Sequence, residues 1–269
     1  ITLNTLNVKI ANAFTWETSL SVAWQKNWIV GLSNGKEDEV ENTRFIDFPI
    51  GVYYAYKATG IWSEEDAEEM AKFNSLVHPV TGEAKTGHNF QVGQTRVEDL
   101  NGDYVIDANH DRTIIGQTNP AWTGGMTNTF TWKGIELMIQ MYGRLGYWTN
   151  GGQVLMGGKY MLRKVDYYNE NNKDASYQRP QLTADGSDTD TYYAALQYSK
   201  ASFVNIRMIS LGYSFPKKLI RGWNNMQSLR MYAQCVNPGA LYQSVKWKNM
   251  DLNSSTWNRN IVFGLQVGF

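Results

Sequence analysis

The chain has 269 residues, enough for one large domain or two ordinary ones, and its 25 basic residues balance its 25 acidic residues. A formal charge of zero gives no sign of the basic surface that binds nucleic acid, so we expect no nucleic-acid partner. A single cysteine, Cys235, excludes an internal disulfide framework, and the absence of any run of about 18 apolar residues argues against a membrane-spanning helix.

Apolar residues alternate with polar ones along most of the chain, which predicts an all-β protein whose strands have one apolar and one wet face. The abundant aromatic residues (10 Trp, 16 Tyr and 10 Phe) suit such strands. The segments with this pattern are 2–13, 16–29, 46–58, 120–133, 135–148, 199–215, 227–236 and 258–269. Several exceed the five or six residues usual in soluble sheets, and this length favours strands that span a membrane.

The connections between these strands are of two kinds. Those at 13–17, 132–134 and 216–227 are short, whereas those at 30–119, 149–198 and 237–257 are long and polar. Short periplasmic turns and long extracellular loops are typical of outer-membrane barrels. Counting back from a periplasmic Phe269 places all three short connections inside, provided that segment 46–58 belongs to the outer loop region.

Aromatic residues flank the predicted strand ends. Trp16, Trp132 and Trp223 lie near the short connections, and Tyr147 and Trp148 lie at an outer end. Rings with an apolar body and a polar edge favour the bilayer interface, so these residues could form two girdles. The alternative is that they are core aromatics of a soluble β-fold.

The last strand has a regular pattern from which the facing of its side chains can be predicted. We expect Ile261, Phe263, Leu265 and Val267 to face lipid and Gln266 to face the barrel interior. Val262 is the exception to the alternation.

One helix is predicted inside the connection 30–119. Ser63 followed by Glu64, Glu65 and Asp66 is a capping-box start, and acidic residues in a first turn complement the helix dipole. The helix should extend to about Phe73.

Oxygen-bearing side chains recur at every second residue in DLNGDYVID, residues 99–107. This spacing matches a calcium loop, in which hard oxygen ligands converge on one ion. The predicted ligands are the side chains of Asp99, Asn101, Asp103 and Asp107 and the carbonyl of Val105. Tyr104 and His110 stand where an EF-hand has Gly and Glu. The alternative is an Asx-rich turn whose carboxylates cap local amides.

No enzyme signature is present, since the chain lacks G-x-S-x-G, H-E-x-x-H and C-x-x-C. We therefore predict a protein that is not an enzyme. The connection 149–198 instead carries tyrosines among Asn, Asp and Gln: Tyr160, Tyr167, Tyr168, Tyr177, Tyr192 and Tyr193. Such faces suit stacking on sugar rings or peptide groups, and equally a protein partner, which we favour.

Three segments in order resemble one family: FPIGVYYAYKATGIW (48–62), VEDLNGDYVIDANHDRTIIGQTNPAWTGGMTNTFTWKGIELMIQMYGRLG (97–146) and KASFVNIRMISLGYSFPKKL (200–219). They are similar to the C-terminal half of SusC/RagA-type outer-membrane proteins, the TonB-dependent transporters of Bacteroidetes. The resemblance covers nearly the whole chain from about residue 5. Tyr104 and the stretch 237–257 depart from the family pattern.

The resemblance implies the fold and the partners. Residues 1–269 would form the C-terminal portion of a 22-stranded antiparallel transmembrane β-barrel, with 30–119 as a long extracellular loop region and with the plug and N-terminal strands absent. A SusD-like surface lipoprotein would act as a lid, and the TonB system would energise import through the missing N-terminal part. The rest of the barrel and outer-membrane lipid would also contact the chain. The alternative that two transporter–lipoprotein pairs form a dimer is left open.

The function implied is import of oligosaccharides or peptides across the bacterial outer membrane. Seven spanning strands are too few for a complete single-chain barrel, which agrees with a part of a larger one. The alternative from a different class is a soluble β-sandwich module that binds glycans, since it would also explain the tyrosines and the calcium-like loop.

Overall fold

A computed structural model describes residues 1–11, 13–151, 165–180, 190–220, 222, 226–246, 248–252 and 257–269. The chain divides into two compact units. Unit 1 comprises Ile1–Lys26, Asn119–Tyr147 and Lys200–Phe269, and unit 2 comprises Asn27–Thr118 and Trp148–Ser199. No helix in the described part is long and apolar enough to cross a membrane.

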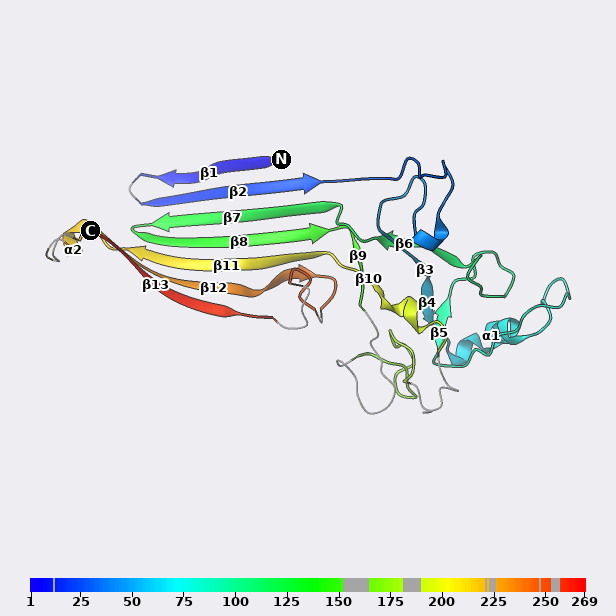
Figure 1. Ribbon diagram of the computed structural model, residues 1–269. Helices are drawn as coiled ribbons and strands as arrows, with labels where there is room; N and C mark the ends of the chain where they lie inside the picture. Colours follow the sequence, from blue (N-terminus) through cyan, green and yellow to red (C-terminus); the bar gives the residue numbers. More distant parts are fainter. Residues whose placement is uncertain are drawn as a thin grey trace. The chain divides into compact units, whose positions relative to one another are not determined.

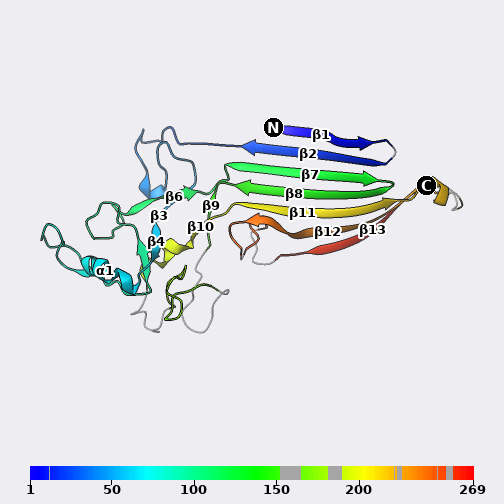
Figure 2. The ribbon, with the colours of Figure 1, turned by 180° about the vertical axis from the view of Figure 1, so that it is seen from behind.

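In its described part, unit 1 is one antiparallel sheet of seven strands, which lie side by side in chain order (Figures 1 and 2). The strands are β1 (Thr2–Ile10), β2 (Phe14–Trp24), β7 (Trp122–Trp132), β8 (Ile135–Leu145), β11 (Phe203–Ser214), β12 (Ser228–Gln243) and β13 (Asn260–Gly268). The all-β prediction is confirmed for this unit. The described sheet is open, with β1 and β13 at its edges, so the closed 22-stranded barrel stays a prediction.

The short connections lie together at one end of the sheet, because each strand runs antiparallel to the next. Lys133 and Gly134 form a two-residue turn with φ of 46° and 91°, the left-handed geometry that tight hairpins require. A Cβ on Gly134 would come within 2.8 Å of the Ser214 carbonyl oxygen, so only glycine fits there. The first turn follows Ile10 and ends before Phe14, a few residues earlier than predicted. The third short connection includes helix α2 (Lys217–Ile220).

The pairing register gives the sheet two chemically different faces. Leu20 pairs with Met126, and Met126 pairs with Met141, so these side chains share one face. Glu136 and Arg230 lie on the opposite face, where the Arg230 Nη2 and Glu136 Oε1 atoms are 2.5 Å apart. One face is therefore apolar and the other polar.

The register agrees with the alternation predicted for β13, and the contact of its apolar residues with lipid stays a prediction. Leu265 pairs with Met231 and Phe263 pairs with Ala233 on the apolar face, whereas Gln266 pairs with Arg230 on the polar face. The apolar side chains on this edge strand are largely exposed, which would be unfavourable if only water surrounded them. The exposed fractions are 70% for Ile261, 80% for Phe263 and 61% for Leu265.

The described residues of unit 2 form three two-stranded sheets and short helices. The sheets pair β3 (Val52–Tyr56) with β6 (Arg112–Gln117), β4 (Ala58–Ile61) with β5 (Thr95–Val97), and β9 (Trp148–Asn150) with β10 (Tyr198–Lys200). The helices are η1 (Val40–Asn42), η2 (Glu64–Asp66), α1 (Ala67–Asn74) and η3 (Tyr193–Gln197). The predicted strand 46–58 is shorter than expected and does not pair with the seven-stranded sheet. The strand directions counted back from Phe269 required that this segment lie outside the sheet.

The predicted helix is confirmed with its start signal. The Ser63 amide and hydroxyl donate to Asp66 Oδ2 at 2.9 and 2.7 Å, and together they form the capping box. Helix α1 packs through Phe73 against Trp62, which is 1% exposed, with ring centroids 5.7 Å apart. Phe90 and Tyr192 complete this aromatic core of unit 2.

Candidate functional site

The carboxylates of the calcium-like loop bind local backbone amides. Asp99 accepts hydrogen bonds from the amides of Gly102 and Tyr104 at 2.8 and 2.9 Å, and Asp103 accepts one from Val105 at 2.8 Å. Tyr104 has φ of 57°, so the residue that replaces the usual glycine adopts the left-handed conformation that a glycine would supply. The loop is thus tightly curled, as both the calcium and the Asx-turn readings expect.

The second half of the loop is held by two acidic side chains. Asp111 is fully buried and accepts from the amides of Leu100 and Asp107 at 2.9 and 2.8 Å, so it ties both ends of the loop together. Asp107 accepts from the Asn109 and His110 amides, and its Oδ2 lies 2.9 Å from His110 Nδ1. This hydrogen bond from His110 lowers the pKa of Asp107 and raises the pKa of His110.

Among the described residues, no group of three or more His, Cys, Asp or Glu side chains is arranged to hold a metal ion. The predicted calcium ligands also include an amide, Asn101, and a backbone carbonyl, Val105. Calcium at this loop therefore stays a prediction, and the observed local hydrogen bonds already account for its shape.

The predicted tyrosines have different environments. Tyr192 belongs to the aromatic core, donates its hydroxyl to the Ile106 carbonyl at 3.2 Å, and has a pKa raised to about 12 by burial. Tyr168 is also buried, and its amide bonds to the Tyr177 carbonyl at 2.9 Å. Tyr167, Tyr177 and Tyr193 are partly exposed, and Tyr160 lies outside the described residues. Three tyrosines thus keep the exposure that a substrate or partner contact needs.

A cavity of about 620 Å³ lies in unit 2, where its three small sheets and η3 meet; we call it the mixed pocket. The sequence did not predict this pocket, because its walls come from segments far apart along the chain. The lining residues are Lys57, Ala58, Glu98, Leu100, Thr113, Ile114, Ile115, Trp148, Ala195, Leu196 and Tyr198. A smaller pocket of about 200 Å³, near His88, Gln91 and Asp190, has more polar walls.

The apolar face of unit 1 has aromatic rows near both strand ends. Trp16 stacks on Phe130 at a centroid distance of 5.6 Å at the end with the short turns, and Trp24 lies 6.3 Å from Trp122 at the other end. Trp132, also predicted for the first row, ends β7 at the short-turn end and is 50% exposed.

The prediction that Tyr147 and Trp148 belong to the outer aromatic row is wrong. Tyr147 is buried against Phe203 and Met250, and the Trp148 ring covers the backbone of Gly116 in unit 2. Both residues follow the end of β8 and have left the apolar face. Trp223 lies outside the described residues.

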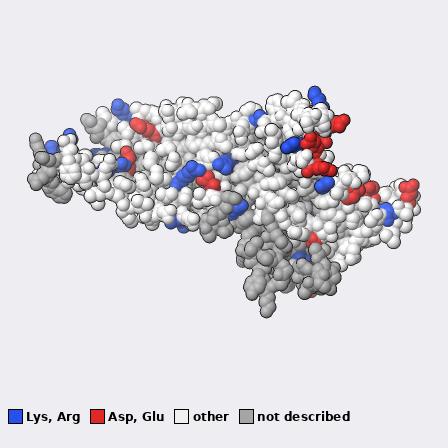
Figure 3. Space-filling view, viewed as in Figure 1, with Lys and Arg blue, Asp and Glu red and all other residues white. Residues whose placement is uncertain are grey.

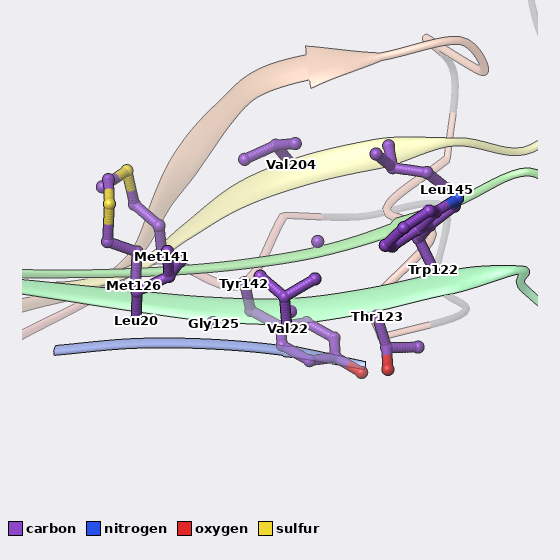
Figure 4. Close-up of a pocket in the computed structure, with 12 residues that line it drawn as sticks. Leu20, Val22, Trp122, Thr123, Gly125, Met126, Met141, Tyr142, Leu145 and Val204 are labelled. Carbon is purple, nitrogen blue, oxygen red and sulfur yellow. The ribbon is translucent and has the colours of Figure 1, made fainter. Parts of the chain in front are cut away.

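Between the two aromatic rows the apolar face carries a shallow depression of about 290 Å³. It forms where Gly124 and Gly143 pair across β7 and β8 without side chains. Met126 and Met141 lie together at one end of the depression, and Trp122 and Leu145 lie together at the other (Figure 4).

The polar face carries an ion pair near the long connection between β12 and β13. Arg207 forms two hydrogen bonds to Asp251, at 3.0 and 2.8 Å, and its guanidinium lies 4.2 Å from the centroid of the Tyr142 ring. Asp251 belongs to the connection between β12 and β13, so this connection folds back onto the polar face. The alternating chemistry of the two faces is what a membrane-spanning barrel wall requires.

Two curated proteins of Formosa agariphila are similar in sequence to the chain. TonB-dependent receptor P39 is 24% identical over 244 residues, which cover 75% of this chain and 22% of the receptor. TonB-dependent receptor P3 is 22% identical over 247 residues, which cover 83% of this chain and 22% of that receptor. The chain thus spans less than a quarter of the length of these relatives. No protein-family model matches it.

Part of a chain in solved structures of the RagAB peptide importer has a fold similar to that of this chain. The structure in the open-open state aligns with 100% of this chain and 28% of the matched chain, with a TM-score of 0.64 and 19% identity. The closed-closed state aligns with 97% of this chain and 28% of the matched chain, with a TM-score of 0.64 and 18% identity. The fold of this chain is therefore similar to that of part of a chain in the RagAB structures.

Proposed function

We propose that this chain, which is a distant homologue of the TonB-dependent receptors, forms part of the barrel wall and of the outer loops of a nutrient importer. The observation that carries the proposal is the two-faced sheet of unit 1. Its apolar face is bounded by aromatic rows near both strand ends, and its short connections all lie at one end.

The homology confirms three sequence-based predictions. The chain is similar to TonB-dependent transporters of the SusC/RagA type, these proteins reside in the bacterial outer membrane, and they are transporters rather than enzymes. The two units divide the proposed work. Unit 1 would contribute to the wall, and unit 2 would contribute the outer loops that meet substrate and partner.

The substrate and partners are part of the proposal. We infer import of peptides or oligosaccharides, and the likeness to the RagAB peptide importer supports the peptide alternative. A SusD-like lipoprotein would cover the outer loops, and the remaining barrel strands would pair with the open edges of β1 and β13. Energy would come from the TonB system acting on a part of the protein outside this chain, and a dimer of transporter–lipoprotein pairs is compatible with this arrangement.

Uptake by cells tests this function. Cells that carry the complete protein should accumulate a fluorescent oligopeptide or maltohexaose, and cells without TonB or without the transporter should not. Accumulation that persists without TonB would contradict the proposal.

Extraction tests the soluble alternative. A barrel wall needs detergent to cover its apolar face, since exposed side chains such as Phe263 would otherwise aggregate. A complete protein that stays monodisperse in buffer without detergent would favour the soluble β-sandwich instead.

A further inference from the structure

Lysine side chains gather at the end of unit 1 where the short connections lie. Lys133 occupies the turn between β7 and β8, and Lys217 and Lys218 begin helix α2, which lies at the same end (Figure 1). The three short connections contain no aspartate and no glutamate. We call these three lysines the lysine rim.

The rim keeps its positive charge, because the acidic side chains of unit 1 lie elsewhere. Glu136 and Asp251 each pair with an arginine, and Glu17 lies on the polar face of β2. No ion pair joins a rim lysine to another residue in the described part of the chain, and all three lysines are exposed.

Apolar side chains stand beside the rim lysines. Lys133 Nζ lies 5.4 Å from the centroid of the Trp132 ring, which holds the ammonium group over a side chain that is 50% exposed. Leu219 directly follows Lys218 and is 64% exposed, whereas Ile220 is buried and anchors α2. Tryptophan rings favour the interface of a bilayer, and lysine stems reach from apolar surface into the polar layer. In a barrel wall the ammonium groups therefore lie at the depth of the lipid phosphates.

The mixture of charged and apolar side chains selects the class of ligand. A free anion would use the ammonium groups but would bury neither Trp132 nor Leu219. An acidic protein segment would meet the same limit, since carboxylates do not cover apolar surface. An anionic phospholipid satisfies both kinds of side chain, because its phosphate attracts the lysines while its acyl chains cover the apolar groups.

We propose that the lysine rim binds the headgroups of anionic phospholipids in the membrane leaflet that meets the short connections. The proposal rests on the proposed role of unit 1 as a barrel wall and adds a lipid preference to that role. Each lysine near a membrane surface contributes about 1 kcal/mol of attraction to anionic lipid, which is about a fivefold change in affinity. Bound headgroups hold this end of the sheet at a fixed depth in the membrane.

Lipid titration of the complete protein, purified in a neutral detergent, tests the rim. The probes are phosphatidylglycerol and phosphatidylcholine with identical acyl chains, and native mass spectrometry measures the binding of each. We expect phosphatidylglycerol to bind more tightly, and we expect the difference to shrink at high salt because the lysines are exposed.

The variants remove the charges of the rim. The double variant Lys217→Gln and Lys218→Gln should weaken phosphatidylglycerol binding about 25-fold, at about fivefold for each lysine, and should leave phosphatidylcholine binding unchanged. Lys133→Gln should weaken it about fivefold. Lys217→Arg and Lys218→Arg together keep the charge and should keep the preference.

The matched control is the double variant Lys200→Gln and Lys246→Gln. It removes the same charge from two exposed lysines near the opposite end of the unit 1 strands. This variant should keep the preference for phosphatidylglycerol. Equal affinity of the unchanged protein for the two lipids, or an equal loss in the rim and control variants, would overturn the proposal.

Competition separates the lipid from other anionic ligands. Displacement of phosphatidylglycerol by hexaglutamate or by inorganic phosphate, at an ionic strength where chloride has no effect, would overturn the proposal and assign the rim to an acidic protein segment or a free anion. Loss of the lipid preference leaves the importer standing, because uptake that depends on TonB does not require it. A complete protein that is monodisperse without detergent and binds neither lipid would reject the barrel wall and the rim together.

Discussion

The two units bury their apolar residues in opposite ways. Unit 2 packs Trp62, Phe73 and Phe90 against one another at the centre, with Trp62 only 1% exposed. Unit 1 has a smaller buried cluster around Phe203, but the large apolar residues of one sheet face point outward, and Phe263 is 80% exposed. The apolar residues of unit 2 are shielded from water in a core, whereas the outward apolar face of unit 1 needs a surrounding apolar phase. The chain thus contains one region whose apolar side chains form an interior core and one region with an apolar face that points outward.

Charge divides along the same boundary. Unit 1 has 13 basic and 3 acidic residues, whereas unit 2 has 12 basic and 22 acidic residues, so a neutral chain combines a cationic and an anionic region. Figure 3, in the view of Figure 1, shows acidic side chains gathered over the part with α1 and the short strands, and few on the long strands. Overall neutrality therefore conceals an acidic region that would attract cationic molecules.

The largest expected effect comes from the core of unit 2. Trp62→Ala should destabilise this unit by about 3–5 kcal/mol, because it removes the ring at the centre of the aromatic core. Hydrogen exchange on the complete protein should show loss of protection in unit 2 with the sheet of unit 1 unchanged. Trp132→Ala, at a tryptophan that is 50% exposed, is the control and should leave unit 2 protected. Equal loss in both variants would contradict the separation of the two units.

The next largest effect should come from a charge placed on the apolar face of unit 1. Ile139→Arg, near the middle of β8, should cost about 2–4 kcal/mol in a bilayer, because the charge would face hydrocarbon. The neighbouring Gln140→Arg places the same charge on the polar face and should be far milder. Urea titration of both variants folded into lipid vesicles measures the difference. Similar losses would refute the assignment of the two faces.

Removal of calcium tests the loop at 99–107. If the loop binds calcium, free calcium at 100 times its dissociation constant should stabilise unit 2 by about 2.7 kcal/mol. Calorimetry with and without chelator measures this, and Asp103→Asn should reduce the shift while Asp174→Asn, an acidic residue outside the loop, should keep it. A melting temperature that chelator does not change would end the calcium hypothesis.

The smallest expected effect is a pH dependence confined to unit 2. Burial lowers the pKa of His88, whose Nε2 accepts a hydrogen bond from the Ile106 amide at 2.8 Å and must be unprotonated to do so. Because the folded pKa is below the unfolded value of about 6.5, the contribution of His88 is fully present above that pH and is lost as pH falls below it. Melting of unit 2 between pH 7.5 and 5.5 should therefore shift downward.

His88→Gln supplies the control, since glutamine offers a neutral acceptor that does not titrate. The variant should lose part of this downward shift. A shift of the same size in the variant and in the unchanged protein would assign the pH dependence to other groups.

Local pattern was enough for much of unit 1. Alternation of apolar and polar residues predicted the long strands and the facing of Leu265 and Gln266, because successive side chains in a strand point to opposite faces whatever lies beyond. The helix start at Ser63 was predictable for a similar reason, since a capping box is completed within four residues. Strand ends were less accurate, as at Phe14, because turn geometry decides them.

Binding residues in unit 2 were much harder to predict. Tyr192 looks like any loop tyrosine in sequence, and only the packing of Phe90 and Tyr56 around it shows that it belongs to the core. The Asp-rich loop allows either calcium ligation or amide capping, since both use the same oxygens at the same spacing.

The sequence by itself determined the period of the strands, the two-faced character of the sheet, the capped helix and the resemblance to outer-membrane transporters. Each of these depends on residues near one another in the chain or on motifs read in order. Only the tertiary structure decided that Trp148 leaves the apolar face to cover Gly116, and that Ala58, Ile114 and Leu196 line one cavity. The physical reason is that a pocket depends on contacts between distant segments, and no local pattern records which of them will meet.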